Sequence, residues 1–172
     1  ELYRENIKTK IIAITGSCGK TTLKELLGNS LKQISTVGIS PKSYNNKYGV
    51  PLSLFNLDQK NNYGVLEIGM DKKGEIDYLS KIVKPDVSVI TNINYAHAKN
   101  FKNIKQIALA KSEIMKNISP NGFVVLNADD NFFDLHKKIA NKKKLRVISF
   151  GIKSKKANVK LVDLKPFRKK FK

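Results

Sequence analysis

Two hydrophobic patterns alternate along the chain: short, nearly continuous apolar runs, and longer segments whose apolar residues recur at helical spacing. The short runs are rich in Ile and Val and are bounded by turn-forming residues, as is typical of buried strands. Five strands and a weaker sixth are predicted, at Lys10–Thr15, Tyr63–Ile68, Asp86–Asn92, Phe123–Leu126, Arg146–Phe150 and Asn158–Val162.

The segments between these runs predict amphipathic helices. They are expected at residues 23–34, 76–83, 104–118 and 132–139. Strands separated by helices of this length indicate right-handed crossovers, so a doubly wound α/β domain is predicted, with a mostly parallel sheet and helices on both faces. Ligands of such sheets bind beyond the carboxyl ends of the strands, which makes polar residues just after strands the candidates for function.

The net charge changes this picture only in part. The chain has 172 residues, with 33 Lys and Arg against 14 Asp and Glu, for a net charge of +19. Residues 137–172 carry 15 basic residues and one acid, or +14, which leaves +5 for residues 1–136. The basic excess is nearly all lysine and lacks the arginine and aromatic residues of a base-reading surface, so nucleic-acid binding is not the favoured interpretation.

Other classes of protein are excluded more simply. The longest apolar runs are far too short for a membrane span. A single cysteine forms no internal disulfide, and no signal-peptide pattern occurs, so a cytoplasmic location is expected. Because the first residue is Glu1, the chain is expected to be an excerpt of a longer protein.

The strongest local motif lies between the first strand and the first helix, at Thr15-Gly16-Ser17-Cys18-Gly19-Lys20-Thr21-Thr22. Glycines allow backbone N–H groups to face a phosphate chain at a helix N-terminus. Lys20 would neutralise the β- and γ-phosphates, and the Thr21 hydroxyl would bind Mg²⁺. The usual P-loop pattern has glycine where this chain has Ile14, so the match depends on the strand–loop–helix context. Cys18 is interpreted as a small loop residue.

Two charged residues occupy positions that should be apolar. Glu67 lies near the end of a buried strand, and Lys111 falls on the inward face of the long helix. Burying either charge without a partner would cost several kcal/mol, of the order of 3–5. Either the two pair with each other or extend outward, or both face a cation at the strand ends.

Further polar candidates lie in loops. His97 follows a strand, which makes it a candidate ligand at the same edge of the sheet. His136 lies in a lysine-rich helix and is predicted to be exposed. In the loop containing Asn45 and Asn46, the paired amides either cap the following helix or reach a phosphate, and the chemistry alone favours neither.

Taken together, six motifs resemble the central ATP-binding domain of the Mur ligase family, and most closely its D-alanyl-D-alanine-adding (MurF-type) members. In order along the chain they are Thr15–Thr22, Tyr44-Asn45-Asn46 with Gly49–Leu52, Glu67–Met70 with Gly74–Ile76, Thr91–Ile93 with His97, Ala110–Ile114, and Leu126–Asp130. The resemblance covers about residues 11–151 and continues weakly to 163. It implies that residues 1–163 form this central domain, that 164–172 are an unmatched basic tail, and that the family's N-terminal and C-terminal domains are absent.

The resemblance also implies a role for each matching residue. Gly16, Ser17, Cys18, Gly19, Lys20, Thr21 and Thr22 would hold ATP. Thr21 and Glu67 would bind one Mg²⁺, and His97 a second. Lys111 matches the lysine that family members carry as a carbamate, an anion suited to a Mg²⁺ site. Lys20, Lys111, His97 and Asn46 would then be the catalytic group, with Asn46 near the γ-phosphate and Asn127 near the adenine.

The implied activity is an ATP-dependent ligation in peptidoglycan biosynthesis. The substrates would be UDP-N-acetylmuramoyl-tripeptide, activated as an acyl phosphate, and D-alanyl-D-alanine, whose amine attacks it. The protein would be a monomer that binds no nucleic acid. Another Mur ligase or a folylpolyglutamate-synthase-like ligase is the alternative within this chemistry, and a basic P-loop protein that binds nucleic acid is the alternative outside it. The excerpt by itself is expected to show little or no turnover.

Overall fold

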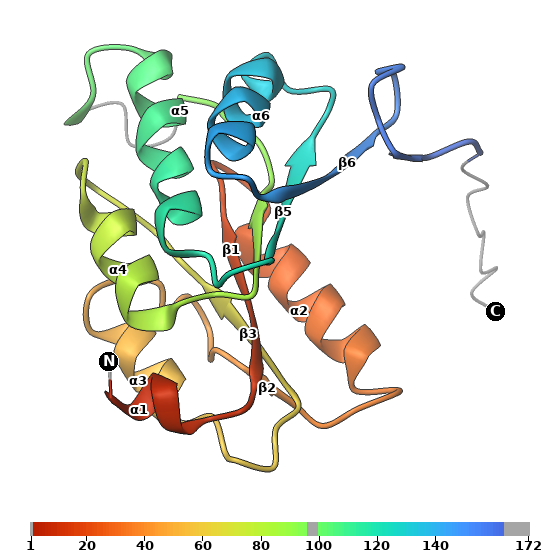
Figure 1. Ribbon diagram of the computed structural model, residues 1–172. Coiled ribbons are helices and arrows are strands. Elements are labelled where there is room, and N and C mark those ends of the chain that lie inside the picture. The colour runs from red at the N-terminus through yellow and green to blue at the C-terminus, as the bar shows by residue number, and fades with distance from the viewer. Residues whose placement is uncertain (1, 96–99, 164–172) are drawn as a thin grey trace, which may run out of the picture.

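Seven strands form one sheet in the computed structural model, which describes residues 2–95 and 100–163 (Figure 1). The strand order is β2-β3-β1-β4-β5-β6-β7, and every neighbouring pair is parallel. The strands are β1 (Lys10–Thr15), β2 (Val37–Ile39), β3 (Tyr63–Glu67), β4 (Val87–Ile90), β5 (Phe123–Asn127), β6 (Arg146–Gly151) and β7 (Val159–Lys160). Because β1 lies between β3 and β4, the ends of those two strands lie next to the P-loop motif.

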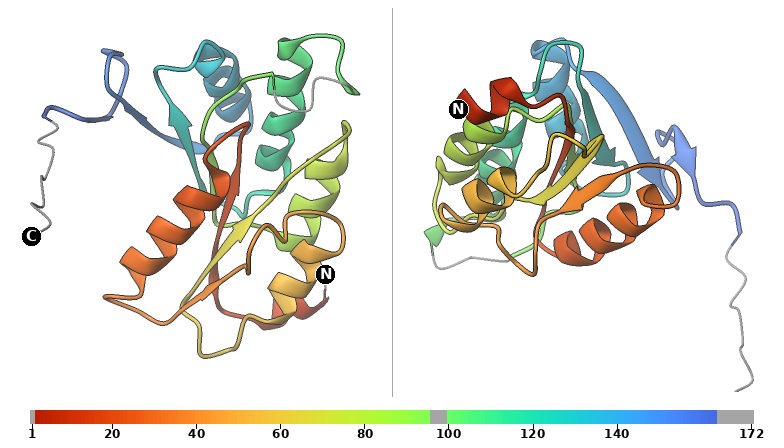
Figure 2. Two further views of the ribbon diagram at one scale, coloured as in Figure 1. Left: turned by 180° about the vertical axis from the view of Figure 1, so that it is seen from behind. Right: turned by 90° about the horizontal axis from the view of Figure 1, so that it is seen from below.

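Helices cover the two faces of this sheet unequally, with α2 on one face and α3 to α6 on the other (Figure 2). They are α1 (Leu2–Asn6), α2 (Lys20–Leu31), α3 (Gly49–Phe55), α4 (Glu75–Val83), α5 (Ile104–Ser112), the 3₁₀ helix η2 (Glu113–Asn117) and α6 (Phe133–Lys142). Within the described residues, no helix is long and apolar enough to cross a membrane. The predicted doubly wound α/β fold is confirmed.

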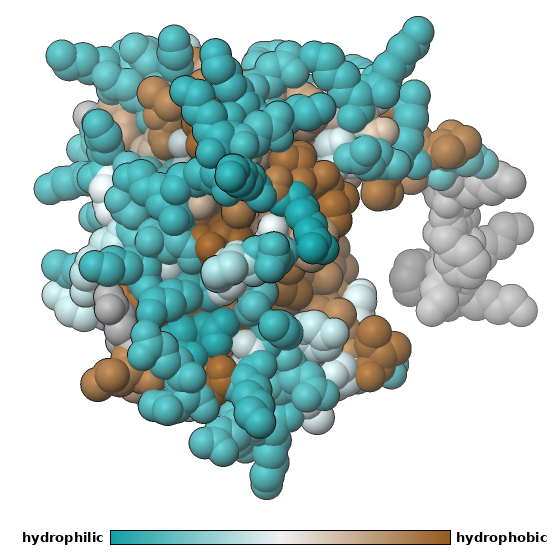
Figure 3. Space-filling view, in the orientation of Figure 1, coloured by the Kyte–Doolittle hydropathy of each residue, from teal (hydrophilic) through white to brown (hydrophobic). Residues whose placement is uncertain are grey.

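The alternation of side chains along β1 separates two cores. Ile11 and Ala13 point into the larger core, beneath the helices α3 to α6. Ile14 points to the opposite face, where Leu23 and Leu27 of α2 pack on it. Beyond α2 this second face is partly open, so that hydrophobic side chains remain visible beside α2 (Figure 3) and Ile148 of β6 is 38% exposed.

The structure refines the sequence prediction at three places. The strand β2 and the helix α1 were not predicted, because elements of three and five residues carry too little periodicity. The predicted helix over 104–118 is instead an α-helix followed by a 3₁₀ segment. There the carboxylate of Glu113 accepts hydrogen bonds from the Gly74 and Asp77 N–H groups at the start of α4.

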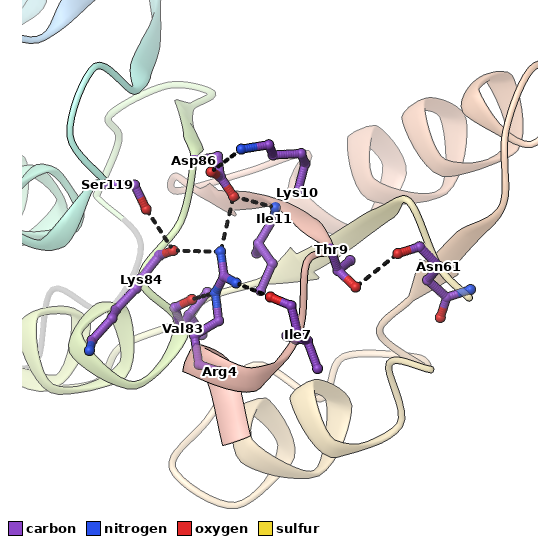
Figure 4. A network of polar contacts seen from close by, with 10 residues as sticks. All are labelled: Arg4, Ile7, Thr9, Lys10, Ile11, Asn61, Val83, Lys84, Asp86 and Ser119. Carbon is purple, nitrogen blue, oxygen red and sulfur yellow. Dashed lines mark hydrogen bonds and ion pairs between the residues drawn. The ribbon is translucent and has the colours of Figure 1, made fainter. Parts of the chain in front are cut away.

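At the amino ends of the strands, Asp86 joins the N-terminal segment to the sheet (Figure 4). Its carboxylate accepts hydrogen bonds from the guanidinium of Arg4 at 3.0 Å, the backbone N–H of Ile11 at 2.9 Å and Lys10 Nζ at 3.3 Å. Arg4 also donates to the carbonyl of Val83 at 2.8 Å. This network holds α1 against the amino ends of the strands, at the end of the sheet opposite to the candidate site.

The prediction that His136 is exposed is wrong. The residue is 2% exposed, and its Nε2 lies 3.0 Å from the carbonyl oxygen of Ala108 in α5. A carbonyl only accepts, so Nε2 carries the proton and donates. Burial lowers the pKa of the His136 imidazole below its usual value. The lysines of α6 face solvent, and they conceal in the sequence that this one position turns toward α5.

Replacing His136 with Gln should remove part of the acid sensitivity of the fold. Between the lowered folded-state pKa and the usual 6.5, the unfolded chain binds a proton that the folded chain does not. The free energy of unfolding of the wild type should therefore fall, relative to H136Q, as pH drops below about 6.5, by up to about 1.4 kcal/mol per pH unit. Urea unfolding of both proteins from about pH 7.5 to about pH 5 measures this. Parallel pH profiles would contradict it.

Candidate functional site

Two glycines give the loop between β1 and α2 its shape. Gly16 has φ +147°, and a Cβ built on it would lie 1.9 Å from Thr91 Oγ1, so no side chain fits there. Gly19 has φ +77° and directly precedes α2. Both backbones lie in the region that favours glycine. The loop therefore curls tightly enough for the N-terminus of α2 to face the ends of the neighbouring strands.

The segment after β4 fixes this loop from one side. Asn92 accepts from the backbone N–H groups of Ser17 and Cys18, at 2.9 Å through its carbonyl and 3.0 Å through its Oδ1. Thr91 Oγ1 donates to the Cys18 carbonyl at 2.7 Å, and Ser17 Oγ donates to the Asn94 carbonyl at 3.0 Å. Cys18 is exposed, which agrees with its interpretation as a small loop residue. The loop is thus preorganised by contacts with the segment that follows β4.

Two lysines converge on the carbonyl oxygen of Gly16. Lys20, the first residue of α2, places Nζ 3.0 Å from it, and Lys111 of α5 places Nζ 2.9 Å from it. Lys111 is 1% exposed. Burial, and next the nearby charge of Lys20, lower the pKa of Lys111 to about 7, although Cys18 acts in the opposite direction. Much of the Lys111 population is therefore a neutral amine near pH 7.

Glu67, at the end of β3, is 1% exposed. Its Oε2 accepts a hydrogen bond from Thr21 Oγ1 at 2.6 Å, and its Oε1 accepts one from Asn45 Nδ2 at 2.7 Å. Glu67 and Lys111 therefore neither pair with each other nor extend to solvent. Glu67 is held by Thr21 and Asn45, and Lys111 by the carbonyl oxygen of Gly16. A hydroxyl and a carboxylate in contact provide the hard oxygen donors that Mg²⁺ prefers.

The two adjacent asparagines have different partners. Asn46 Oδ1 accepts from the N–H groups of Tyr48, the residue before α3, and of Gly49, its first residue, at 3.1 and 2.9 Å, so this amide oxygen is engaged at the start of α3. Asn45 is the residue that contacts Glu67. Nothing in the sequence distinguishes Asn45 from its neighbour as a site residue, because only the three-dimensional path of the loop separates their roles. Asn46 nevertheless lines the cavity described next.

A cavity of about 590 Å³ opens beside Lys20, between the start of α3 and the segment from Gly69 to Glu75. Lys47, Lys72 and Lys73 also line it, together with Asp71 and Glu75, so its lining carries charges of both signs with lysine in excess. A second cavity, of about 410 Å³, lies at the ends of β5, β6 and β7. The two cavities lie on opposite sides of the P-loop strand in the sheet order.

Asn127 lines the second cavity and donates through Nδ2 to the carbonyl of Thr91 at 3.2 Å. It thereby connects this cavity to the segment that fixes the P-loop.

Thr22 lies exposed in the first turn of α2. His97, the predicted second Mg²⁺ ligand, lies outside the described residues. In residues 2–95 and 100–163, no three His, Cys, Asp or Glu side chains group closely enough to hold a metal on their own.

The comparison with protein families matches residues 14–172 to the Mur ligase middle domain. The chain belongs to the Mur ligase family. The resemblance seen in the six sequence motifs is thus confirmed, and the P-loop, Glu67 and Lys111 lie in the matched region.

Proteins similar to this Mur ligase middle domain include D-alanyl-D-alanine-adding (MurF) ligases. A UDP-N-acetylmuramoyl-tripeptide–D-alanyl-D-alanine ligase of Buchnera aphidicola is 42% identical over 89% of this chain and 33% of its own length. A MurF crystal structure from Acinetobacter baumannii superimposes with a TM-score of 0.86 at 38% identity, over 95% of this chain and 35% of that one. A MurF ligase from Thermotoga maritima in complex with ADP superimposes with a TM-score of 0.79 at 36% identity, over 89% of this chain and 36% of that one. The chain thus spans about a third of the length of these relatives.

Replacing Gly16 with Ala should destabilise the domain more than replacing Gly19 with Ala. Both substitutions place a side chain on a positive-φ backbone, but only the Cβ at Gly16 meets another atom, Thr91 Oγ1. We expect Gly19→Ala to cost about 1 kcal/mol, and Gly16→Ala to cost about 1–3 kcal/mol more through overpacking. Urea unfolding of the two variants measures the difference, and equal losses would show that the contact with Thr91 is unimportant.

Proposed function

We propose that this Mur ligase middle domain binds Mg²⁺-ATP as part of a ligase that joins D-alanyl-D-alanine to UDP-N-acetylmuramoyl-tripeptide. The observation that carries the proposal is the convergence of Lys20, Lys111 and the Thr21–Glu67 pair around a glycine-shaped loop at the end of β1. The 42% identity to a ligase of that name supports the choice of substrates. The reaction would serve peptidoglycan biosynthesis, in the cytoplasm.

The nucleotide would lie across the carboxyl ends of the central strands. Residues 16–22 would hold its phosphates, because the loop and the first turn of α2 present N–H groups and a positive helix end. Lys20 would stabilise the transferring γ-phosphoryl group. The second cavity, next to Asn127, would hold the adenine. The ADP found in the Thermotoga maritima relative supports a nucleotide in this fold.

The oxygen-rich pair of Thr21 and Glu67 fits Mg²⁺, with His97 proposed as a ligand of a second ion. Bound Mg²⁺ would neutralise charge on the phosphates. Lys111 would contribute as a carbamate. Its neutral amine, favoured by the pKa of about 7, would attack CO₂, form an N–C bond and release one proton, which leaves an anion beside the P-loop. The carbamate would replace a buried cation by a group that attracts Mg²⁺.

The remaining chemistry concerns the acyl substrate. The cavity beside Lys20 and Asn46, in which lysines outnumber acidic residues, would hold the peptide carboxylate that receives the phosphoryl group. The D-alanyl-D-alanine amine would then attack the acyl phosphate, form the amide bond and release phosphate. Because the chain spans about a third of its relatives' length, ligation is proposed for a monomer in which residues 1–163 act together with the rest of a complete ligase. The chain alone is expected to bind nucleotide weakly, with little turnover.

Nucleotide binding by the 172-residue chain tests the first part of this proposal. Titration of ADP with MgCl₂ should give saturable heat by calorimetry, and Lys20→Ala should weaken the affinity at least about tenfold, since a charge-assisted contact is worth about 1.5–3 kcal/mol. Lys32→Ala, at an exposed position after α2, is the matched control and should bind as the wild type does. Equal affinity of the Lys20 variant would contradict the assignment. Tight, steeply salt-dependent binding of DNA or RNA would favour the nucleic-acid alternative.

Amide formation by the complete ligase tests the role of Lys111. Lys111→Ala should lower ADP release in the presence of tripeptide substrate and D-alanyl-D-alanine by about 100-fold or more, as expected for loss of a group that organises phosphoryl transfer. Lys105→Ala, an exposed lysine of α5, is the control. If a carbamate forms, removal of CO₂ should slow the wild type and bicarbonate should restore it. Unchanged activity of the Lys111 variant would remove the carbamate hypothesis, and turnover with a folate acceptor would change the substrate assignment.

A further inference from the structure

Lys24 is a charged residue for which nucleotide binding offers no role. It lies on α2, three residues after Thr21, and is 0% exposed, which makes it one of the most deeply buried large side chains in the described structure. An ammonium group in this position is costly unless partners replace the water it has lost. Its contacts therefore indicate what it does.

One contact joins Lys24 to the loop that follows β2. Its Nζ donates a hydrogen bond to the carbonyl oxygen of Lys42. The backbone of Lys42 is left-handed, with φ 45°, a conformation that residues other than glycine rarely adopt. The other charged contact, Glu25 Oε1 at 3.1 Å, belongs to a side chain that is 49% exposed. The buried ammonium thus fastens a strained point of the loop to α2.

Three residues after Lys42, the same loop reaches the candidate metal site. The carbonyl of Asn45 accepts a hydrogen bond from the Gly69 N–H at 2.7 Å, and its Nδ2 donates to Glu67 Oε1 at 2.7 Å. The other carboxylate oxygen of Glu67 is held by Thr21. The helix α2 therefore controls both oxygens of Glu67: one directly through Thr21, and the other through Lys24, the loop and Asn45.

We propose that Lys24 is a positioning residue for the Mg²⁺ site, which fastens residues 40–46 to α2 so that Asn45 holds the Glu67 carboxylate in place. The part that concerns Mg²⁺ rests on the proposed function. The fastening of the loop does not, because it is a property of the chain without nucleotide or metal. Two measurements therefore separate the two parts.

The first measurement is hydrogen exchange in the metal-free chain. Lys24→Met keeps the length of the side chain and removes the ammonium group, so the loop should open more often and the Gly69 N–H should exchange at least about tenfold faster. Lys32→Met, an exposed lysine just after the same helix, is the matched control and should leave that amide unchanged. Lys24→Arg retains a cationic donor and should restore part of the protection. Wild-type exchange at Gly69 in a folded Lys24→Met chain would overturn the proposal.

The second measurement is the MgCl₂ concentration that half-saturates ADP binding. We expect Lys24→Met and Asn45→Ala each to raise it, and the double variant to raise it no further than Asn45→Ala alone, because the first acts through the second. Additive effects would overturn the proposed route and leave Lys24 with a purely structural role. If Lys24→Met does not fold, Lys24→Arg and Lys24→Gln replace it in both measurements. Wild-type values for both of these variants would also overturn the proposal.

If the wild type binds no Mg²⁺-ADP, the proposed function fails, while the exchange of Gly69 still decides whether Lys24 fastens the loop. Conversely, if Mg²⁺-ADP binds normally and Lys24→Met changes neither measurement, only the role of Lys24 fails. The two hypotheses therefore have distinct outcomes.

Discussion

Two lysine side chains share one acceptor at the centre of the site. Lys20 and Lys111 both donate to the carbonyl oxygen of Gly16, from different helices and at nearly equal distance. Burial, and next the charge of Lys20, lower the pKa of Lys111, because an ammonium group there loses its water and lies beside a like charge that repels it. The arrangement lowers the cost of receiving an anion, because a phosphate or a carbamate would relieve the repulsion that the protein alone sustains.

The order of the strands brings the P-loop, Glu67 and the segment after β4 together. With β1 between β3 and β4, the P-loop, Glu67 and the segment from Thr91 to Asn94 leave the sheet side by side. Asn92 then fixes the loop from the β4 side, while Thr21 reaches the β3 side through Glu67. A single helix, α2, supplies both a candidate phosphate ligand and a candidate metal ligand in its first turn. Rigidity on both sides of the loop suits a site that works by positioning charges.

Most of the fold was predictable from the sequence, because its strands are continuous apolar runs and its longer helices are strongly periodic. Glu67 and Lys111 stand out in the sequence as candidate site residues for a related reason, since each charge conflicts with its apolar surroundings. Asn45 was not, because only the three-dimensional path of the loop decides which of two adjacent amides meets Glu67. Lys24 and His136 were missed because a buried position among many lysines looks, in sequence, like another solvated one.

The outermost strands of the described sheet, β2 and β7, have only three and two residues. A strand at the edge of a sheet exposes N–H and C=O groups to which another chain can add a strand, and short edges limit this. Lys160 adds a charge at the β7 edge. The shortness of these strands, which makes β2 hard to predict from the sequence, therefore limits aggregation through strand pairing. Neighbouring copies of the described domain meet little free backbone at these two edges, even though the hydrophobic face beside α2 is partly open.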